Sequence, residues 1–173
     1  MLPTNSTGAE LGVWKGAFSA QLLERVRPER LHLVGPWTFR AELPQAFYGG
    51  AVAGSQQDMD AIYESVRARF AKAISEGTVQ IHRAQSDVAA ATFGIGELDW
   101  VYIDGDHRYE AVREELDLYS RLVKPGGIVA GDDYHGRGWW KGGVKRAVDE
   151  WASKTAIDEL TFVGSQFVAR LPA

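Results

Sequence analysis

Short apolar runs alternate with stretches of helical periodicity along this chain, and the alternation restricts its fold more than any other feature. Five apolar runs have the length and composition of buried strands: Ala9–Val13, Arg30–Val34, Thr78–His82, Leu98–Ile103 and Ile128–Ala130. Segments with a helical period lie after them: Gly16–Val26, Gln56–Ser75, Asp87–Ala91, Tyr109–Leu122 and Val144–Ala152. This order is typical of a parallel sheet with helices on both faces.

Two further strands follow the last helix. Leu160–Val163 and Gln166–Arg170 flank a Gly164-Ser165 turn, and we expect them to form a hairpin. We therefore predict an α/β fold with a doubly wound, Rossmann-like sheet of seven strands, mostly parallel with a C-terminal antiparallel hairpin. The 173 residues suit a single domain, residues 1–173. Trp37–Ser55 is rich in Gly, Pro and aromatic residues and predicts a long loop, which in a compact domain is often functional.

The composition argues against nucleic acid and membranes as partners. The chain has 19 Lys and Arg against 23 Asp and Glu, a net charge of −4, whereas proteins that neutralise phosphates are usually basic. It has no cysteine, which excludes disulfides and thiolate metal sites. No apolar run approaches the roughly 20 residues that span a bilayer, and the first residues do not resemble a secretion signal. We expect a cytoplasmic protein.

Aspartates stand directly after two of the predicted strands. Asp104 follows Leu98–Ile103, and the pair Asp132 and Asp133 follows Ile128–Ala130. The carboxyl ends of strands in an open α/β sheet border the ligand crevice, and carboxylates without thiolates suit Mg²⁺, Ca²⁺ or Mn²⁺. The three aspartates therefore predict a metal site. The alternative is that such aspartates cap helices or form turns, which is the interpretation we prefer for Asp106.

His107 is the candidate base. It lies three residues after Asp104, at the start of the next predicted helix, and imidazole accepts a proton near neutral pH. His32 and His82 fall inside strand patterns, so we expect them to be structural. His135 follows the second acidic cluster and is a site residue of second rank.

Glycines and aromatics complete the candidate crevice. Gly12 and Gly16 stand at the first strand-to-helix turn, where an anionic group can approach the backbone, although two glycines there are often only turn chemistry. The turn does not match G-x-G-x-x-G, so a dinucleotide fingerprint is absent. Trp139 and Trp140 lie between glycines in a segment that we expect to be either a substrate lid or a dimer contact.

Four motifs in this order resemble the class I S-adenosylmethionine-dependent methyltransferases. They are Ala9-Glu10-Leu11-Gly12-Val13-Trp14-Lys15-Gly16-Ala17-Phe18-Ser19, Leu33-Val34-Gly35-Pro36-Trp37, Asp104-Gly105-Asp106-His107, and Pro125-Gly126-Gly127 leading to Gly131-Asp132-Asp133. Within that family, the metal-dependent O-methyltransferases acting on macrolide sugars, and more distantly on catechol, are the most similar branch. The similarity runs from Ala9 to Arg170.

The resemblance implies a role for each motif. S-adenosylmethionine would be held by Glu10, Gly12, Gly16, Gln85, Ser86 and Asp104. Mg²⁺, or another hard divalent cation, would be bound by Asp104, Asp132 and Asp133. Asp104 and His107 would be catalytic, with His107 as the base that takes the proton of a small-molecule hydroxyl.

The chain departs from the family pattern in two places. Gly35 stands where an acidic residue usually binds both ribose hydroxyls, so either another acid such as Asp58 or Asp60 reaches the ribose or the cofactor is held weakly. The first predicted strand begins at Ala9, without the helices that cover the cofactor in many relatives. We therefore expect a pocket that is open, closed by Trp37–Ser55, or completed by the partner chain of a homo-oligomer.

The sequence thus predicts an S-adenosylmethionine-dependent methyltransferase, with Mg²⁺-dependent O-methylation of a small-molecule hydroxyl. One alternative is a non-catalytic or weakly active member that only binds ligands. Another is a nicotinamide-dependent enzyme of similar fold, against which the missing dinucleotide fingerprint counts.

Overall fold

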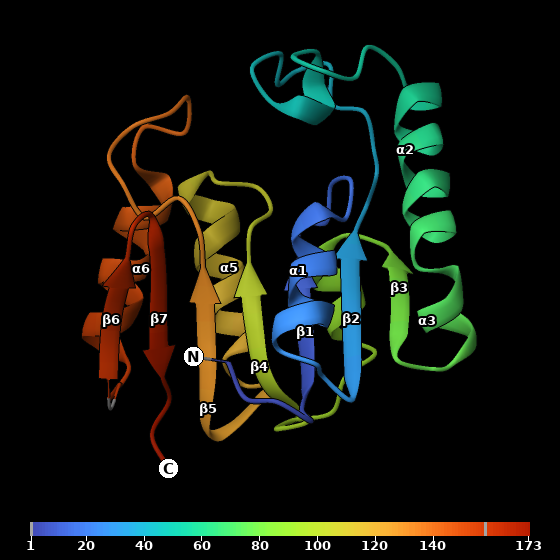
Figure 1. Ribbon diagram of the computed structural model, residues 1–173. Coiled ribbons are helices and arrows are strands. Elements are labelled where there is room, and N and C mark those ends of the chain that lie inside the picture. The colour runs from blue at the N-terminus through green and yellow to red at the C-terminus, as the bar shows by residue number, and fades with distance from the viewer. Residues whose placement is uncertain (1, 158) are drawn as a thin grey trace.

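Seven strands form one sheet in the computed structural model, which describes residues 2–157 and 159–173. In chain order they are β1 Thr7–Leu11, β2 Arg30–Gly35, β3 Val79–Arg83, β4 Leu98–Ile103, β5 Val123–Gly131, β6 Glu159–Val163 and β7 Gln166–Arg170. The strand order in the sheet is β3-β2-β1-β4-β5-β7-β6 (Figure 1). β1 to β5 pair in parallel, whereas β7 is antiparallel to both β5 and β6. The predicted fold class is therefore confirmed.

The direction of strand order reverses between β1 and β4, and this reversal positions the site. β1 pairs with β2 on one side and with β4 on the other, so Ala9 lies beside both His32 and Val101. At the carboxyl end, the Asp104 amide donates to the Leu11 carbonyl at 2.9 Å. In doubly wound sheets, ligands bind in the crevice at such a switch point.

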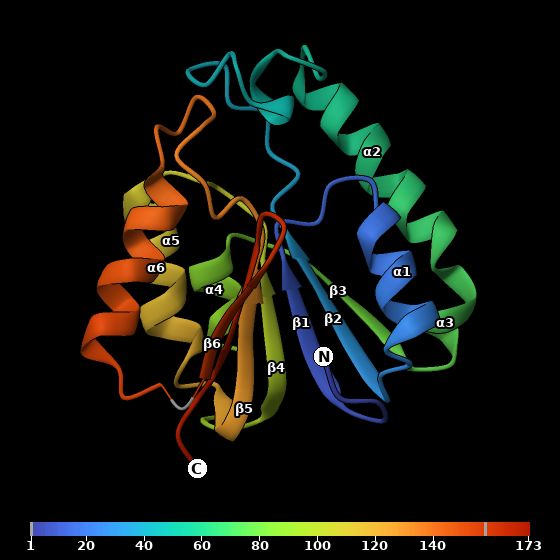
Figure 2. The same cartoon turned by 60° about the vertical axis from the view of Figure 1, so that its left-hand side comes forward.

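Helices cover both faces of the sheet (Figure 2). One face carries α1 Ala17–Arg25, α2 Gln56–Arg69 and α3 Ala71–Ser75, and the other carries α4 Ser86–Ala90, α5 Tyr109–Tyr119 and α6 Gly143–Lys154. Each face has its own apolar core. Fully buried Trp100 belongs to the first core, and Leu116 and Phe167 belong to the second. Because helices cover both faces, β1, β2 and β4 are buried almost throughout.

Several predicted elements have different bounds in the structure; β5, for example, begins at Val123 rather than Ile128. β1 ends at Leu11 rather than Val13, because the chain turns at Gly12 with a φ of 91°. The predicted helix Gln56–Ser75 is split into α2 and α3 at Phe70, whose φ of −102° and ψ of 13° interrupt the helix. The Phe70 ring packs against Gly16, where an added Cβ would lie 2.7 Å from it. Tertiary packing thus overrides a continuous helical pattern.

The β2–α2 loop (residues 36–55) passes above the carboxyl ends of the strands (Figure 2). It contains the 3₁₀ helix η1, Phe47–Gly49. Its first residues are fixed by Trp37, which is buried and donates from Nε1 to the Trp14 carbonyl at 3.0 Å. The Gln56 side chain also donates to the Trp37 carbonyl. The loop is therefore anchored at both ends over the strand termini.

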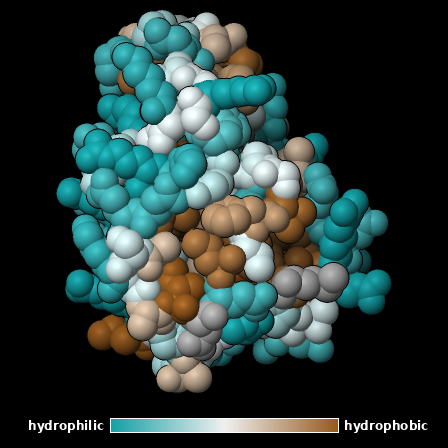
Figure 3. Space-filling view, turned by 90° about the vertical axis from the view of Figure 1, so that its left-hand side faces the viewer, coloured by the Kyte–Doolittle hydropathy of each residue, from teal (hydrophilic) through white to brown (hydrophobic). Residues whose placement is uncertain are grey.

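The β6 edge of the sheet exposes apolar side chains. Phe162 is 47% exposed and Val163 is 66% exposed. Figure 3 views the molecule from this side and shows hydrophobic side chains between hydrophilic ones. Among the described residues, the structure contains no helix that is long and apolar enough to cross a membrane.

Candidate active site

A cavity of about 360 Å³ opens at the carboxyl ends of the strands. It lies between the turn after β1, the loops after β3, β4 and β5, and the β2–α2 loop. This volume falls within the range of small-molecule sites, which is on the order of 300–1,000 Å³. The fold therefore provides a site where the sequence predicted one.

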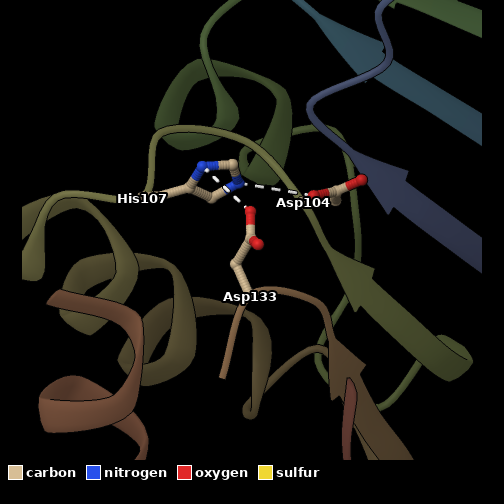
Figure 4. A group of neighbouring side chains, drawn as sticks. All are labelled: Asp104, His107 and Asp133. Atoms are coloured by element: carbon tan, nitrogen blue, oxygen red, sulfur yellow. Dashed lines mark hydrogen bonds and ion pairs between the residues drawn. The ribbon is translucent and has the colours of Figure 1, made fainter. Parts of the chain in front are cut away.

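His107 lies between two carboxylates on the wall of this cavity. Its Nε2 is 3.3 Å from Asp104 Oδ1, and its Nδ1 is 3.4 Å from Asp133 Oδ2. Figure 4 shows that Asp104 and His107 come from the loop after β4, whereas Asp133 comes from the segment after β5. One ligand atom from each of the three lies within 4.8 Å of the others, so the group could hold a metal ion.

The aspartates make His107 more basic. Burial alone would lower the pKa of His107, but the hydrogen bond with Asp104 and the charges of Asp133 and Asp104 outweigh it and raise this pKa. Burial also raises the pKa of Asp104, against the effect of His107. The pKa values of His107 and Asp104 are therefore both higher than those of the isolated side chains.

Asp133 and its neighbour Asp132 have separate roles in the structure. Asp133 has a φ of 60°, a left-handed conformation that is uncommon outside glycine and is found at functional sites. Asp132 Oδ1 accepts from the Asp133 amide at 2.7 Å and from Ser165 Oγ at 2.5 Å. Asp132 does not line the cavity. The structure thus groups His107, rather than Asp132, with Asp104 and Asp133, and the ligand role of Asp132 stays a prediction.

Aromatic side chains border the same end of the cavity. The Trp140 ring lies 4.8 Å from the His107 ring and 5.6 Å from the His135 ring, between ring centroids. Trp139 and Phe47 also line the cavity. The Trp140 indole Nε1 is buried without a hydrogen-bond partner among the residues that the structure describes. Trp140 itself lines the cavity.

Glycines shape the opposite end. An added Cβ at Gly12 would lie 2.1 Å from the Asp104 carbonyl oxygen, so the two turns can meet only without a side chain there. Gly12 lines the cavity, whereas Gly16 begins α1 away from it and packs on Phe70. Glu10 is buried beneath this turn, and burial raises its pKa to about 8. The ligand roles predicted for Gly16 and Glu10 remain predictions.

The Trp37 indole lies beside Gly35, the position where an acidic residue was expected to bind the ribose. An added Cβ at Gly35 would lie 3.2 Å from the Trp37 ring and 3.0 Å from the Val13 carbonyl oxygen. Asp58 is engaged at the start of α2 by Ser55 and the Gly54 amide, and Asp60 pairs with Arg83. Neither lines the cavity. The structure thus does not bring either acid to the place of the expected one.

A family model described as a methyltransferase domain matches residues 9–134 of this chain. The matched part is more than half of the sequence and contains all the cavity-lining residues named above except Trp139 and Trp140. The chain belongs to this methyltransferase family.

Solved structures share the fold of this methyltransferase. A Clostridium thermocellum protein described as an rRNA methylase has a TM-score of 0.67 at 13% identity and covers 99% of this chain and 89% of its own. The O-methyltransferase NovP has a TM-score of 0.65 at 20% identity, over 98% and 73%. A Streptococcus mutans protein described as a methyltransferase, solved with S-adenosylhomocysteine, has a TM-score of 0.62 at 10% identity, over 98% and 90%.

One curated protein matches over a short stretch. The uncharacterized protein R132 of Acanthamoeba polyphaga mimivirus is 40% identical over 42 residues, which are 24% of this chain and 19% of that protein. The family match and the shared fold support an S-adenosylmethionine-dependent enzyme.

The methyltransferase cavity also contains a residue that sequence reasoning missed. Gln85 and Ser86 line the cavity, where the resemblance placed them, but so does Glu115. The sequence did carry a signal for it, because Glu115 is an acid on the buried, otherwise apolar face of α5. Tyr48 also lines the cavity, and it is one of the aromatic residues of the Trp37–Ser55 loop, which the sequence offered as possible pocket walls.

Proposed function

We propose that this methyltransferase transfers a methyl group from S-adenosylmethionine to a hydroxyl of a small molecule, with His107 as the base. The proposal depends above all on one observation: His107 lies between Asp104 and Asp133 on the wall of the cavity that also contains the Gly12 turn. A base at a ligand crevice of this family is suited to activating an acceptor hydroxyl.

The donor would occupy the glycine end of the cavity. Gly12, Gln85 and Ser86 line that end, and the cavity continues from there to His107. S-adenosylmethionine would supply a sulfonium methyl group, and a bound divalent cation would stabilise the deprotonated acceptor oxygen. Trp37 closes the floor at Gly35, so the ribose would be held without an acid from β2.

The carboxylates are suited to a hard divalent cation. Asp104 and Asp133 would hold it, since their oxygens lie within 4.8 Å of each other and carboxylates are preferred Mg²⁺ ligands. Asp132 would join them only by giving up its hydrogen bond with Ser165.

His107 would take the proton of the acceptor hydroxyl as the oxygen–methyl bond forms and the sulfur–methyl bond breaks. Asp104 and Asp133 keep its imidazole in place from two sides and favour its protonated form, so they assist it as a base. Trp140 would donate from Nε1 to a second oxygen of the acceptor. A small acceptor agrees with the size of the cavity, and O-methylation agrees with the likeness to NovP.

Calorimetric titration of the pure chain with S-adenosylhomocysteine, with and without Mg²⁺, tests the proposal. We expect saturable binding of S-adenosylhomocysteine and no binding of NAD at the same concentration. Binding of NAD alone would favour the nicotinamide-dependent alternative. Binding of S-adenosylhomocysteine without any methyl transfer in a screen of hydroxyl acceptors would favour the non-catalytic alternative. The predicted homo-oligomer and cytoplasmic location stay predictions.

A further inference from the structure

An acid on α5 faces the cavity without a hydrogen-bond partner for one of its oxygens. Glu115 is only 6% exposed and lines the cavity. Its Oε2 is buried and has no partner within residues 2–157 and 159–173. A buried polar atom without a hydrogen-bond partner is unfavourable, so its presence in a cavity wall points to a ligand group that it would accept from.

Glu115 sits between the loops after β3 and β4. Its Oε1 lies 3.5 Å from the position that a Cβ on Gly105 would take, directly beside the Asp-Gly-Asp-His loop. The Ser86 side chain is near enough to lower the pKa of Glu115, against the larger effect of burial. One turn further along α5, Tyr119 donates from Oη to the Ser86 carbonyl at 2.8 Å. Glu115 thus lies beside the start of α4, with Oε2 left for a ligand.

A second unpartnered group reaches the same cavity from the β2–α2 loop. The Tyr48 hydroxyl oxygen is buried and, in the described part of the chain, has no hydrogen-bond partner. Burial, followed by the charge of Asp106, raises the pKa of Tyr48 to about 12, so the group remains a hydroxyl that can donate. Tyr48 and Glu115 both line the cavity.

An unpartnered acceptor and an unpartnered donor in one cavity are complementary to an amine next to a ring nitrogen. A 6-aminopurine has this pair, because its exocyclic amine donates and its neighbouring ring nitrogens accept. A 6-oxopurine has an acceptor oxygen in place of the amine, and an ionised carboxylate would repel it. Since burial raises the pKa of Glu115 to about 7, the two purines are compared above that pH.

We propose that Glu115 is a specificity-determining residue that selects the 6-amino purine ring of the methyl donor, with Tyr48 donating to an adjacent ring nitrogen. This inference rests on the proposed function. A purely structural role for Glu115, holding Ser86 at the start of α4, is the competing explanation. Glutamine keeps the shape and can still accept from Ser86, so Glu115→Gln separates the two.

The test compares S-adenosylhomocysteine with S-inosylhomocysteine, its 6-oxo analogue, by calorimetry. For the parent chain we expect the adenosyl compound to bind at least about 10-fold more tightly, since a site that pairs with an amine discriminates against an analogue that lacks it. Glu115→Gln should bring this ratio close to 1, because an amide can donate to the 6-oxo group. Glu114→Gln, which changes the exposed neighbour on α5, should keep the parent ratio.

An unchanged ratio in folded Glu115→Gln would overturn the inference and leave the proposed function intact. If the parent chain bound neither compound, the proposed function would be wrong and this inference with it. Tyr48→Phe serves if Glu115→Gln does not fold. It should weaken S-adenosylhomocysteine binding several-fold and leave thermal unfolding unchanged, and an unaltered affinity would contradict the role of Tyr48.

Discussion

The two ends of the cavity are built by different means. The end around His107 is made of charged side chains that directly follow β4 and β5, and their oxygens and nitrogens face one another. At the other end, glycines without side chains allow close approach: the Asp104 backbone packs against Gly12, and the Trp37 ring packs against Gly35. The first end supplies chemistry, and the second supplies shape.

Substitutions at the two ends of the cavity should therefore have different effects. A polar side chain at the charged end can be exchanged for a similar one with little change in packing, so the loss should appear in the reaction. At the glycine end, any added atom meets backbone or a buried ring, so the loss should appear in folding and ligand binding together. Five variants, with two controls, test this contrast in order of expected effect.

His107→Asn should have the largest effect on the reaction. We expect the turnover number to fall by about 10²–10⁴-fold, the usual contribution of a general base. S-adenosylhomocysteine affinity and thermal unfolding should stay near those of the parent, since Asn keeps a polar group between the two aspartates. Turnover is measured at saturating acceptor, and a fully active variant would remove His107 from the reaction.

Gly12→Ala should affect the fold and the ligand together. Its φ of 91° disfavours alanine, and the added Cβ would lie 2.1 Å from the Asp104 carbonyl oxygen. The conformation alone should lower the free energy of unfolding by about 1–3 kcal/mol, and the displaced turn should abolish S-adenosylhomocysteine binding. Urea denaturation and calorimetry measure the two effects.

Gly136→Ala is the matched control, because an added Cβ there meets nothing within 4 Å. It should leave both measurements unchanged. If Gly12→Ala behaved like this control, the contrast between the two ends of the cavity would be wrong.

Asp133→Asn and Asp132→Asn compare the ligand set in the structure with the one predicted from sequence. Asn tolerates the left-handed backbone of Asp133, so both variants should fold. We expect Asp133→Asn to lower Mg²⁺ affinity by at least about 10–100-fold, a loss that supporting residues of metal sites already produce. Asp132→Asn should lower it less. Equal losses, measured by calorimetric Mg²⁺ titration, would restore Asp132 as a ligand.

Glu10→Gln should have the smallest effect, and only on stability. Burial raises the pKa of Glu10 from 4.5 to about 8, while the nearby Ser19 side chain opposes this shift and the Asp104 charge adds to it. The folded chain thus favours neutral Glu10, and this contribution is complete below about pH 4.5 and is lost as the pH rises through about 8.

The parent chain should therefore lose more thermal stability than Glu10→Gln between pH 7 and pH 9. Glu24→Gln, which changes an exposed acid of α1, is the control and should follow the parent. Parallel pH profiles for all three chains would show that Glu10 does not remain neutral beneath the cavity.

Much of the fold could be predicted because its signals are local. Apolar runs, helical periods and turn residues occur within short windows, and the strands and the closing hairpin are where these patterns place them. The proximity of Asp104 and His107 follows from a three-residue spacing at the end of β4, and Asp133 joins them because β4 and β5 are neighbours in the sheet. His32 and His82 lie side by side within β2 and β3, as expected for structural histidines.

The parts that could not be predicted depend on residues distant in sequence. At the break between α2 and α3 the Phe70 ring packs on Gly16, and at the end of β2 the Trp37 ring packs on Gly35. Glu115 and Tyr48 line one cavity because α5 and the β2–α2 loop both border the carboxyl ends of the strands.

The sequence by itself determined the order of strands and helices, and which chemical groups stand at the strand ends, because backbone propensity and hydrophobic period act over a few residues. The tertiary structure alone decided which of those groups meet, which aspartate turns to Ser165 and which faces His107, and which polar atoms are left free in the cavity. Side-chain direction and burial are set by packing between elements, and packing is a property of the whole chain.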